Sequence, residues 1–236
     1  MRRIAVFSDV HGNYQVLKSI IDDLSQNRFD DVICLGDLVG IGPESFLCLE
    51  EIKNSNIKMV LGNHELYQLH GTEIDNLPES FCEHERWVNN TLSLEQLAFL
   101  KTCPLHIDIL EDGKLFTFSH FLFDRNNDKY PFLPLSVIND DIKTYLKEIS
   151  CDYLFFGHEH NSFSLDNVRQ VFTCVGSSGC VFSNVTFYTV IEIYDDLVKV
   201  YKRYISYDRK AFEKSLKNIE YPDREFIAKS FFNVDL

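Results

Sequence analysis

The order of apolar segments along the chain predicts an α/β fold with a parallel core. Three short apolar runs of strand length alternate with two amphipathic segments over residues 4–61, and this alternation is typical of βαβ units. Further along, apolar runs separated by turn residues predict antiparallel strands. The 236 residues are 45% hydrophobic and 25% charged, a size and composition that suit one large globular domain.

The first part of the predicted sheet contains strands over residues 4–7, 32–35 and 57–61. Between them, apolar side chains at helical spacing predict a helix over residues 14–26, and Pro43 before the next apolar stripe predicts a second helix. The uninterrupted apolar run at 32–35 predicts a strand that is buried on both faces.

The second part is predicted to begin with a helical insertion at about residues 66–102, where Ser93 opens a capping-box pattern. The segments 105–110 and 114–119 predict a hairpin. A helix at 137–149 and strands at 153–156, 169–175, 186–194 and 197–205 are expected to follow, the last three antiparallel. We expect residues 1–205 to form one domain, and the charged, phenylalanine-containing stretch 206–236 to pack on this core or on a partner subunit.

The formal net charge of −13 argues against stable binding to nucleic acid. The cysteines number seven and form no CxxC pair, which favours free thiols in a reducing compartment. The first apolar run ends at Ser8, too early for a signal peptide, and no stretch approaches the length of a membrane-spanning helix. We therefore expect a cytoplasmic protein without a membrane partner; the sequence leaves its oligomeric state open.

Metal-binding residue types follow five of the predicted strands directly. Alone, an acid such as Asp37 after a strand is more often a turn cap than a ligand. Carboxylate, amide and imidazole groups together suit borderline divalent ions, and a set of this size suits two ions that share one carboxylate. The residues are Asp9, His11, Asp37, Asn63, His64, His120, His158 and His160.

With these residues the sequence resembles the calcineurin-like metallophosphoesterases, over residues from about 4 to 160. The resemblance implies two mixed β-sheets packed as a sandwich and flanked by helices in four layers. It also implies a dinuclear metal-dependent phosphohydrolase that acts on a small phosphate ester or phosphodiester. The matching segments are Asp9-Val10-His11, Gly36-Asp37, Gly62-Asn63-His64-Glu65, His120 and Gly157-His158-Glu159-His160.

The resemblance also implies a role for each residue. Asp9, His11 and His160 would hold one ion, Asn63, His120 and His158 would hold the other, and Asp37 would bridge them. His64 would face the substrate and assist the leaving group, while a metal-bridging hydroxide attacks phosphorus in line. The ions would be two divalent transition metals, with manganese expected first and iron, zinc, cobalt or nickel as alternatives.

Two residues carry open alternatives. His120 is followed by Phe121, where many members of the family have glycine, so His106 is a second candidate for its position. Glu65 either orients His64 or, as an exposed acid at a helix start, serves only the structure.

The loop after Asp37 suggests which branch of the family the chain resembles. Residues 38–43 contain no arginine, whereas protein Ser/Thr phosphatases and symmetrical dinucleotide-tetraphosphate hydrolases have an Asp-Arg pair here. The loop looks like that of the small bacterial phosphodiesterase-type branch. Dinucleotide polyphosphate hydrolase, protein phosphatase and a non-enzymatic scaffold remain as alternatives. Arg125 is a weak candidate for contact with a substrate phosphate. Arg86 and Trp87 are weak candidates for contact with a nucleobase.

Overall fold

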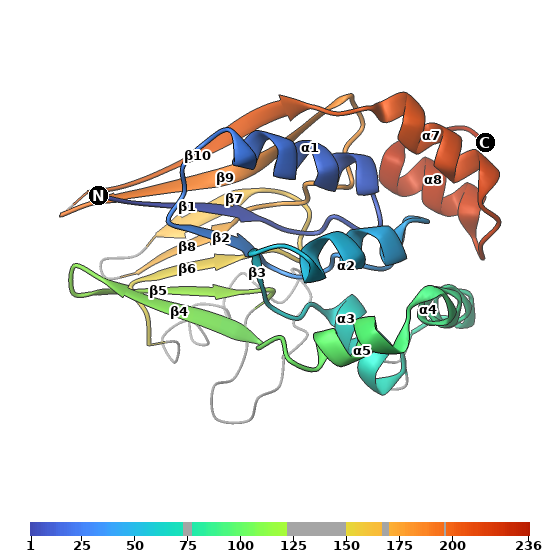
Figure 1. Cartoon of the computed structure of the whole chain (residues 1–236), viewed down its shortest axis with the longest axis horizontal. Coiled ribbons are helices and arrows are strands. Elements are labelled where there is room, and N and C mark those ends of the chain that lie inside the picture. Colours follow the sequence, from blue (N-terminus) through green and yellow to red (C-terminus); the bar gives the residue numbers. More distant parts are fainter. Residues whose placement is uncertain (73–76, 122–149, 167–169, 196) are drawn as a thin grey trace.

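Two mixed five-stranded β-sheets pack face to face in the computed structural model (Figure 1). The structure describes residues 1–236 except 73–76, 122–149, 167–169 and 196. Helices flank the sandwich, so the predicted fold class is confirmed. The predicted helix at 137–149 and the candidate Arg125 lie outside the described residues.

The first sheet has the strand order β10-β9-β1-β2-β3. Its parallel part is formed by β1 (Arg2–Phe7), β2 (Asp31–Cys34) and β3 (Lys58–Met59). The antiparallel part is the hairpin of β9 (Val185–Tyr194) and β10 (Leu197–Ser206), with β9 next to β1. Strand β3 is shorter than predicted: beyond it, the amide of residue 61 donates to the carbonyl of residue 104, in the loop that leads to β4, at 2.9 Å.

The second sheet has the order β4-β5-β6-β8-β7. The hairpin of β4 (His106–Glu111) and β5 (Lys114–Ser119) confirms the prediction. Strand β6 (Tyr153–Phe156) runs parallel to both β5 and β8 (Val171–Cys174). The expectation of an antiparallel strand near 169–175 is therefore only half right, because β8 is antiparallel to β7 (Phe163–Asp166) alone. Strand β7 was not predicted, because three of its four residues are exposed and it has no apolar run.

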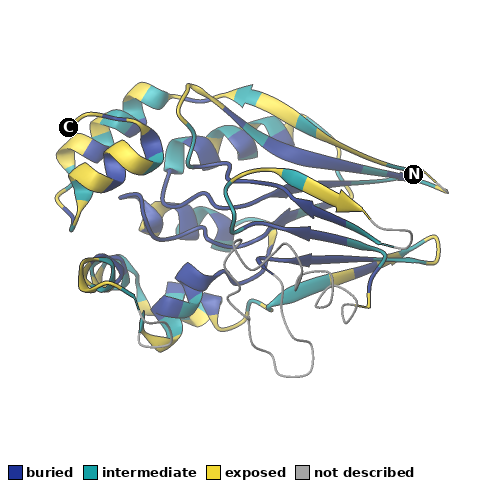
Figure 2. Ribbon diagram, turned by 180° about the vertical axis from the view of Figure 1, so that it is seen from behind, coloured by how far each residue is buried: buried dark blue, intermediate teal, exposed yellow. Residues whose placement is uncertain are grey.

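The core follows from the alternation of side chains along the strands. In β1, Ile4 and Val6 face the second sheet, whereas Ala5 and Phe7 pack with the helices on the outer face of the first sheet. Residues 33–35 at β2 divide in the same way, which confirms a strand buried on both faces. Figure 2 shows the central strands as the buried interior of the molecule.

Helices α1 (Tyr14–Ser25) and α2 (Ser45–Lys53) follow β1 and β2 and contribute to the core on the outer side of the first sheet. Asn13 caps α1, its Oδ1 accepting a hydrogen bond from the amide of residue 16 at 3.2 Å. Three further helices lie between β3 and β4: α3 (Asn63–His70), α4 (Glu79–Thr91) and α5 (Leu94–Leu100).

The C-terminal stretch forms two helices that were not predicted, α7 (Arg209–Asn218) and α8 (Arg224–Phe232). They lie side by side at one end of the sandwich (Figure 1), and Phe212 and Phe232 are part of the same core as α1 and α2. Tyr221, between the helices, contacts the ring of Trp87 on α4 at a centroid distance of 5.4 Å. The extension thus packs on the core of its own chain.

In the described part of the chain, every helix is too short or too polar to cross a membrane.

Candidate metal centre

All predicted site residues meet at one end of the sandwich, where the parallel strands of both sheets end. Hydrogen bonds between the loops continue the sheet pairing past the strands. The amide of Asp9 donates to the carbonyl of Gly36 at 3.1 Å, and the amide of His11 donates to the carbonyl of Asp37 at 3.0 Å. In the second sheet, the amide of Gly157 donates to the carbonyl of His120 at 2.9 Å. Backbone hydrogen bonds therefore help to hold the loops in register.

The first group of side chains contains Asp9, His11 and His160. The Nε2 atoms of His11 and His160 lie 2.9 Å apart. Asp9 Oδ1 lies 3.7 Å from Nε2 of His11 and 3.6 Å from Nε2 of His160. Three potential donor atoms thus surround one point.

The second group contains Asn63, His120 and His158. Asn63 Oδ1 lies 3.1 Å from Nε2 of His120 and 3.0 Å from Nδ1 of His158. Asn63 is the first residue of α3, and both histidines come from loops after strands of the second sheet. His120 is the predicted ligand whose following residue differs from the glycine of many family members. Its side chain is 1% exposed and faces Asn63.

Asp37 lies between the two groups. Its Oδ2 is 3.2 Å from Nε2 of His120 and 3.8 Å from Nε2 of His11. Its Oδ1 accepts a hydrogen bond from the amide of His64 at 3.0 Å. One carboxylate therefore reaches a residue of each group. The structure brings together all seven predicted ligands.

The orientation of the histidine rings suits the binding of cations. Nδ1 of His11 faces the carbonyl of Val39 at 3.2 Å, and Nδ1 of His120 faces the carbonyl of Leu35 at 2.9 Å. A carbonyl only accepts, so we assign the hydrogen of each neutral ring to Nδ1, which leaves the Nε2 lone pairs directed into the site. Burial acts to lower the pKa of His120, but Asp37 outweighs it and raises that pKa to about 9, so without metal Nε2 of His120 holds a proton toward Asn63 and Asp37 that a bound cation would replace.

The protonation states suit the same purpose. Burial holds the pKa of His11 well below its usual range and lowers that of His158 to about 3, so both rings are neutral and can bind a metal. Burial acts to raise the pKa of Asp37, but the charged imidazoles of His120 and His64 outweigh it and hold that pKa well below its usual range.

His64 is held by a residue that sequence reasoning missed. Its Nδ1 lies 2.8 Å from Oε1 of Glu85 on α4, and Oε2 of Glu85 accepts a hydrogen bond from Gln68 at 2.6 Å. Burial acts to lower the pKa of His64, but the carboxylates of Glu85 and Asp37 outweigh it and raise the pKa to about 9. Glu85 is 2% exposed. Nothing in the polar sequence of α4 distinguishes it from the neighbouring acids.

Glu65 has a structural role, but it is not exposed as expected. It is 0% exposed, and its two carboxylate oxygens accept backbone hydrogen bonds from Asp37, Leu38, Val39 and Gly62 at 2.8–3.1 Å. These donors belong to the loop after β2 and to the start of α3. Glu65 therefore fastens the segments that carry Asp37 and Asn63 to each other.

The remaining weak candidates lie elsewhere. His106, the alternative to His120, starts β4 and lies 3.8 Å from Asp108. Arg86 pairs with Glu79 at 2.6 Å, while Trp87 packs between the rings of His84 and Tyr221.

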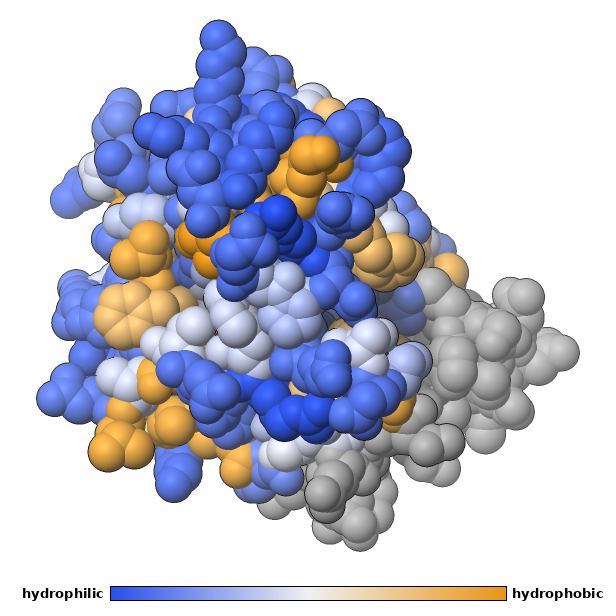
Figure 3. Space-filling view, turned by 90° about the vertical axis from the view of Figure 1, so that its right-hand side faces the viewer, coloured by the Kyte–Doolittle hydropathy of each residue, from blue (hydrophilic) through white to orange (hydrophobic). Residues whose placement is uncertain are grey.

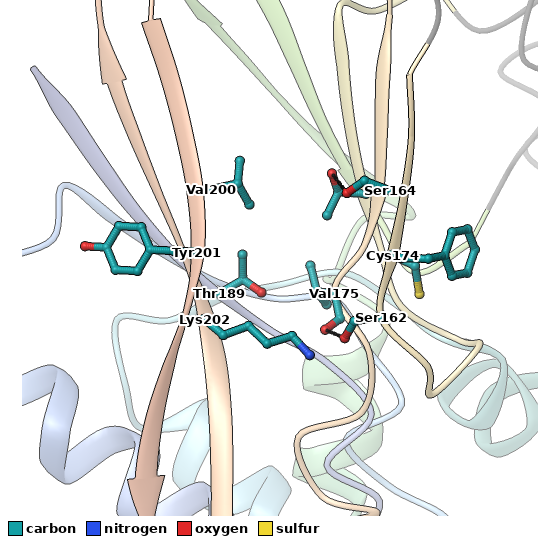
Figure 4. A pocket seen from close by; sticks show the side chains of 10 residues that line it. Ser162, Ser164, Cys174, Val175, Thr189, Val200, Tyr201 and Lys202 are labelled. Carbon is teal, nitrogen blue, oxygen red and sulfur yellow. Dashed lines mark hydrogen bonds between the residues drawn. The ribbon is translucent and has the colours of Figure 1, made fainter.

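A pocket of about 270 Å³ opens between strands β7 and β8 of one sheet and β9 and β10 of the other (Figure 4). Lys202 and Ser162 are among its lining residues, but no candidate ligand is. The ammonium of Lys202 lies 3.7 Å from the ring centroid of Phe187.

Figure 3 shows the end of the molecule that carries α4, α7 and α8. Hydrophobic patches there are separated by hydrophilic surface. The imidazole of His160 is 29% exposed, whereas that of His11 is 1% exposed. Solvent therefore reaches the first group of side chains from the side of His160.

Comparison with known proteins identifies the family. The model of the calcineurin-like phosphoesterase family matches residues 2–162. An uncharacterized protein of Methanocaldococcus jannaschii is 29% identical over 91% of this chain and 92% of its own length. Serine/threonine-protein phosphatase 2 of Escherichia coli is 27% identical over 75% of this chain and 88% of its own length.

A solved structure has the same fold. The metallophosphoesterase from Sphaerobacter thermophilus superposes with a TM-score of 0.71 at 21% sequence identity, covering 94% of this chain and 95% of its own. The family match spans well over half of the chain. The chain therefore belongs to the calcineurin-like phosphoesterase family and is a metal-dependent phosphoesterase.

Proposed function

We propose that the protein is a dinuclear metal-dependent phosphohydrolase whose preferred substrates are phosphodiesters. The observation that carries this proposal is the position of Asp37, whose Oδ2 lies 3.2 Å from a ring nitrogen of one ligand group and 3.8 Å from one of the other. A shared carboxylate is what two ions about 3.5–4 Å apart require. Asp9, His11 and His160 would hold the first ion, and Asn63, His120 and His158 the second.

The bound ions would supply the nucleophile by lowering the pKa of water, and would neutralise charge on the phosphoryl group. The protein's own contribution is then orientation and proton delivery. Glu85 binds Nδ1 of His64, which leaves Nε2 as the ring atom that can donate a proton to the departing oxygen. A leaving alkoxide needs such a proton, and a positioned imidazole is suited to give it.

The loop after Asp37 supports a diester over a monoester. Leu38 and Val39 are 0% exposed and Ile41 is 5% exposed, so this loop packs in the core and offers no cation to the substrate. A phosphodiester carries one negative charge at neutral pH, and a monoester carries nearly two. The diester therefore needs less positive charge from the protein. This reasoning agrees with the predicted phosphodiesterase-type branch.

Protein phosphatase activity is the second candidate, because the relative from Escherichia coli is named as a serine/threonine-protein phosphatase and matches most of its length. The dinucleotide polyphosphate hydrolase and the non-enzymatic scaffold are the remaining alternatives. Manganese remains the predicted metal, and a cytoplasmic location also stays a prediction.

The test begins with metal-free protein supplied separately with Mn²⁺, Co²⁺, Ni²⁺ or Zn²⁺. The substrates are bis-p-nitrophenyl phosphate, p-nitrophenyl phosphate, a phosphoserine peptide and a dinucleotide polyphosphate. We expect metal-dependent turnover that is fastest on the diester. Faster turnover of the peptide would favour a protein phosphatase over a phosphodiesterase, and faster turnover of the dinucleotide would favour a dinucleotide polyphosphate hydrolase. Absence of turnover with every metal would favour the non-enzymatic scaffold.

The Asp37→Asn variant tests the shared carboxylate, with Asp22→Asn on the exposed side of α1 as the matched control. We expect Asp37→Asn to lose most activity and bind fewer than two ions, and Asp22→Asn to behave as wild type. Unchanged activity in Asp37→Asn would overturn the dinuclear centre.

A further inference from the structure

A sulfur atom lies beside the first ligand group. Ring nitrogens of His11 and His160 and the Sγ atom of Cys180 all lie within 4.8 Å of one another. All seven cysteines are free thiols, and in the described part of the chain Cys180 alone belongs to such a cluster. Cys180 follows none of the five strands whose ends carry the predicted ligands, so it comes to the site from a sixth loop, at residues 176–180.

This loop is fastened to the segment that carries the first group. The amide of Gly179 donates to the carbonyl of Asp9 at 3.0 Å, and the Oγ of Ser177 donates to the same carbonyl at 2.7 Å. Ser177 Oγ also accepts a hydrogen bond from the amide of Cys180 at 2.8 Å. The position of Cys180 relative to Asp9 is therefore set by the backbone amide of Gly179 and the side-chain hydroxyl of Ser177.

Gly179 allows the close approach. A Cβ atom at this position would collide with the backbone carbonyl of Val10, which lies between Asp9 and His11. The carbonyl of Gly179 in turn accepts a hydrogen bond from Nδ2 of Asn13 at 3.0 Å. Only a residue without a side chain lets the loop lie directly against the ligand segment and present the next residue, Cys180, to the two histidines.

The distances agree with coordination of one ion. Zinc binds nitrogen and sulfur ligands at about 2.0–2.3 Å in tetrahedral sites, so two ligands of one zinc ion lie roughly 3.5 Å apart. Atoms that already lie within 4.8 Å of one another reach this geometry with small side-chain movements. Asp9 Oδ1, 3.6–3.7 Å from the two imidazoles, and the shared carboxylate of Asp37, 3.8 Å from His11, would extend this to a set of two nitrogens, two oxygens and one sulfur.

We propose that Cys180 is a thiolate ligand of the first ion and makes this position selective for zinc, iron or cobalt over manganese. On binding, the S–H bond breaks, a metal–sulfur bond forms and the proton passes to solvent. Thiolate is a soft ligand that favours such ions, whereas the nitrogen and oxygen donors of Asn63, His120 and His158 also suit manganese. The two positions would then prefer different metals. This inference rests on the proposed dinuclear centre.

Cobalt is the probe that tests the proposal, because cobalt bound to thiolate has a sulfur-to-metal charge-transfer band in the near ultraviolet. Metal-free wild-type protein, Cys180→Ser and Cys82→Ser are titrated with Co²⁺. Cys82 is a half-buried thiol on α4 and belongs to none of the ligand clusters found among the described residues, so Cys82→Ser is the matched control. The visible d–d bands report cobalt binding independently of sulfur.

We expect the charge-transfer band in wild type and Cys82→Ser, and its loss in Cys180→Ser with the d–d bands retained. The zinc affinity of Cys180→Ser should fall at least about tenfold, because even the loss of a residue that only hydrogen-bonds to a metal ligand typically costs that much. The manganese affinity should change less. Bound cobalt without the band in wild type, or a band that survives Cys180→Ser, would overturn the proposal.

The wild-type spectrum tests for a cobalt–sulfur bond even if Cys180→Ser does not fold. Cys180→Ala serves as a second variant without the thiol. Wild type that binds cobalt and hydrolyses the diester but lacks the band would leave the proposed function standing and overturn the role of Cys180. Failure to bind cobalt at all would overturn both.

Discussion

Among the described residues, half of the ten non-glycine residues with positive φ angles are candidate ligands. Five of the seven have positive φ angles: Asp9 at 54°, His11 at 49°, Asp37 at 48°, His158 at 68° and His160 at 54°. Residues other than glycine rarely adopt this left-handed region, at a cost on the order of 1–3 kcal/mol each. Such strain persists where the surroundings enforce it, and here the hydrogen bonds between loops and those that the Glu65 carboxylate accepts from backbone amides do so.

At the residue scale, His64→Ala separates proton delivery from metal binding. We expect the rate on a diester with a poor leaving group to fall roughly 10²–10⁴-fold. Metal content, measured by elemental analysis, should stay at the wild-type value, because the two proposed ligand groups do not include His64. A variant that loses metal would show instead that His64 is a ligand.

Glu85→Gln tests whether Glu85 is a positioning residue. Glutamine keeps the shape of the side chain but loses the charge that strengthens its hydrogen bond to His64. Such a bond contributes about 1.5–3 kcal/mol, so we expect kcat to fall about ten- to hundredfold. KM and metal content should not change. Glu83→Gln, on the exposed side of the same helix, is the control, and an equal effect of both substitutions would contradict the assignment.

At the scale of single elements, helix α8 packs on the core through one of its faces. Phe232 is 0% exposed and its ring lies 4.8 Å from that of Phe212, whereas Phe226 on the same helix is 65% exposed. Removing a buried phenylalanine side chain costs about 3–5 kcal/mol. Phe232→Ala should lower the free energy of unfolding by that amount in a urea titration, and Phe226→Ala should leave it nearly unchanged. Equal effects would mean that α8 does not pack as described.

An ion-pair cluster joins the three parallel strands at the end remote from the metal centre. Asp31 on β2 accepts from Arg2 on β1 and from Lys58 on β3, each at 2.6 Å. Burial acts to raise the pKa of Asp31, but Lys58 and Arg2 outweigh it, and the net effect lowers the pKa. The unfolded state therefore binds a proton more readily than the folded state, so this contribution to stability rises with pH.

The expected pH dependence has a definite sign. The contribution of Asp31 is complete above the unfolded pKa of about 3.9 and is lost as the pH falls through the lower folded pKa. At neutral pH, Asp31→Asn should cost about 1.5–3 kcal/mol. Urea titrations of both proteins at several pH values should show this difference shrink below about pH 4. A difference that stays constant in acid would contradict the linkage.

At the scale of the whole molecule, the metal centre joins the two sheets. Asp9, His11 and Asp37 follow strands of the first sheet, whereas His120, His158 and His160 follow strands of the second. Buried carboxylates and imidazoles of both sheets face one another at this junction. Bound cations would therefore contribute to stability as well as to chemistry.

Removal of metal should lower the melting temperature. A ligand at 100 times its dissociation constant stabilises the folded state by about 2.7 kcal/mol, and each kcal/mol shifts the melting temperature of a chain of this size by about 2–4 °C. We expect a chelator to lower it by about 5–10 °C in a thermal scan. Asp37→Asn, with its ligand set broken, should respond less, and an equal response would place the stabilising ions elsewhere.

The sequence predicted those parts of the fold that depend on neighbouring residues. Apolar runs located β1, β2, β5 and β6 to within two residues at each end, and helical spacing located α1. It failed where the local pattern is weak: β7 is mostly exposed, and the charged stretch 206–236 hides two helices whose buried phenylalanines are far apart along the chain.

For this protein the sequence alone determined the class of chemistry, because the ligand types stand directly after buried strands and parallel strands bring their carboxyl ends to one edge. Tertiary structure decided which further side chains lie beside these residues. Glu85 and Cys180 come from a helix and a loop whose sequences show no such function. They reach His64 and His11 only because α4 and the loop at residues 176–180 pack against the ligand loops. Proximity between residues distant in sequence is set by packing, which no local pattern records.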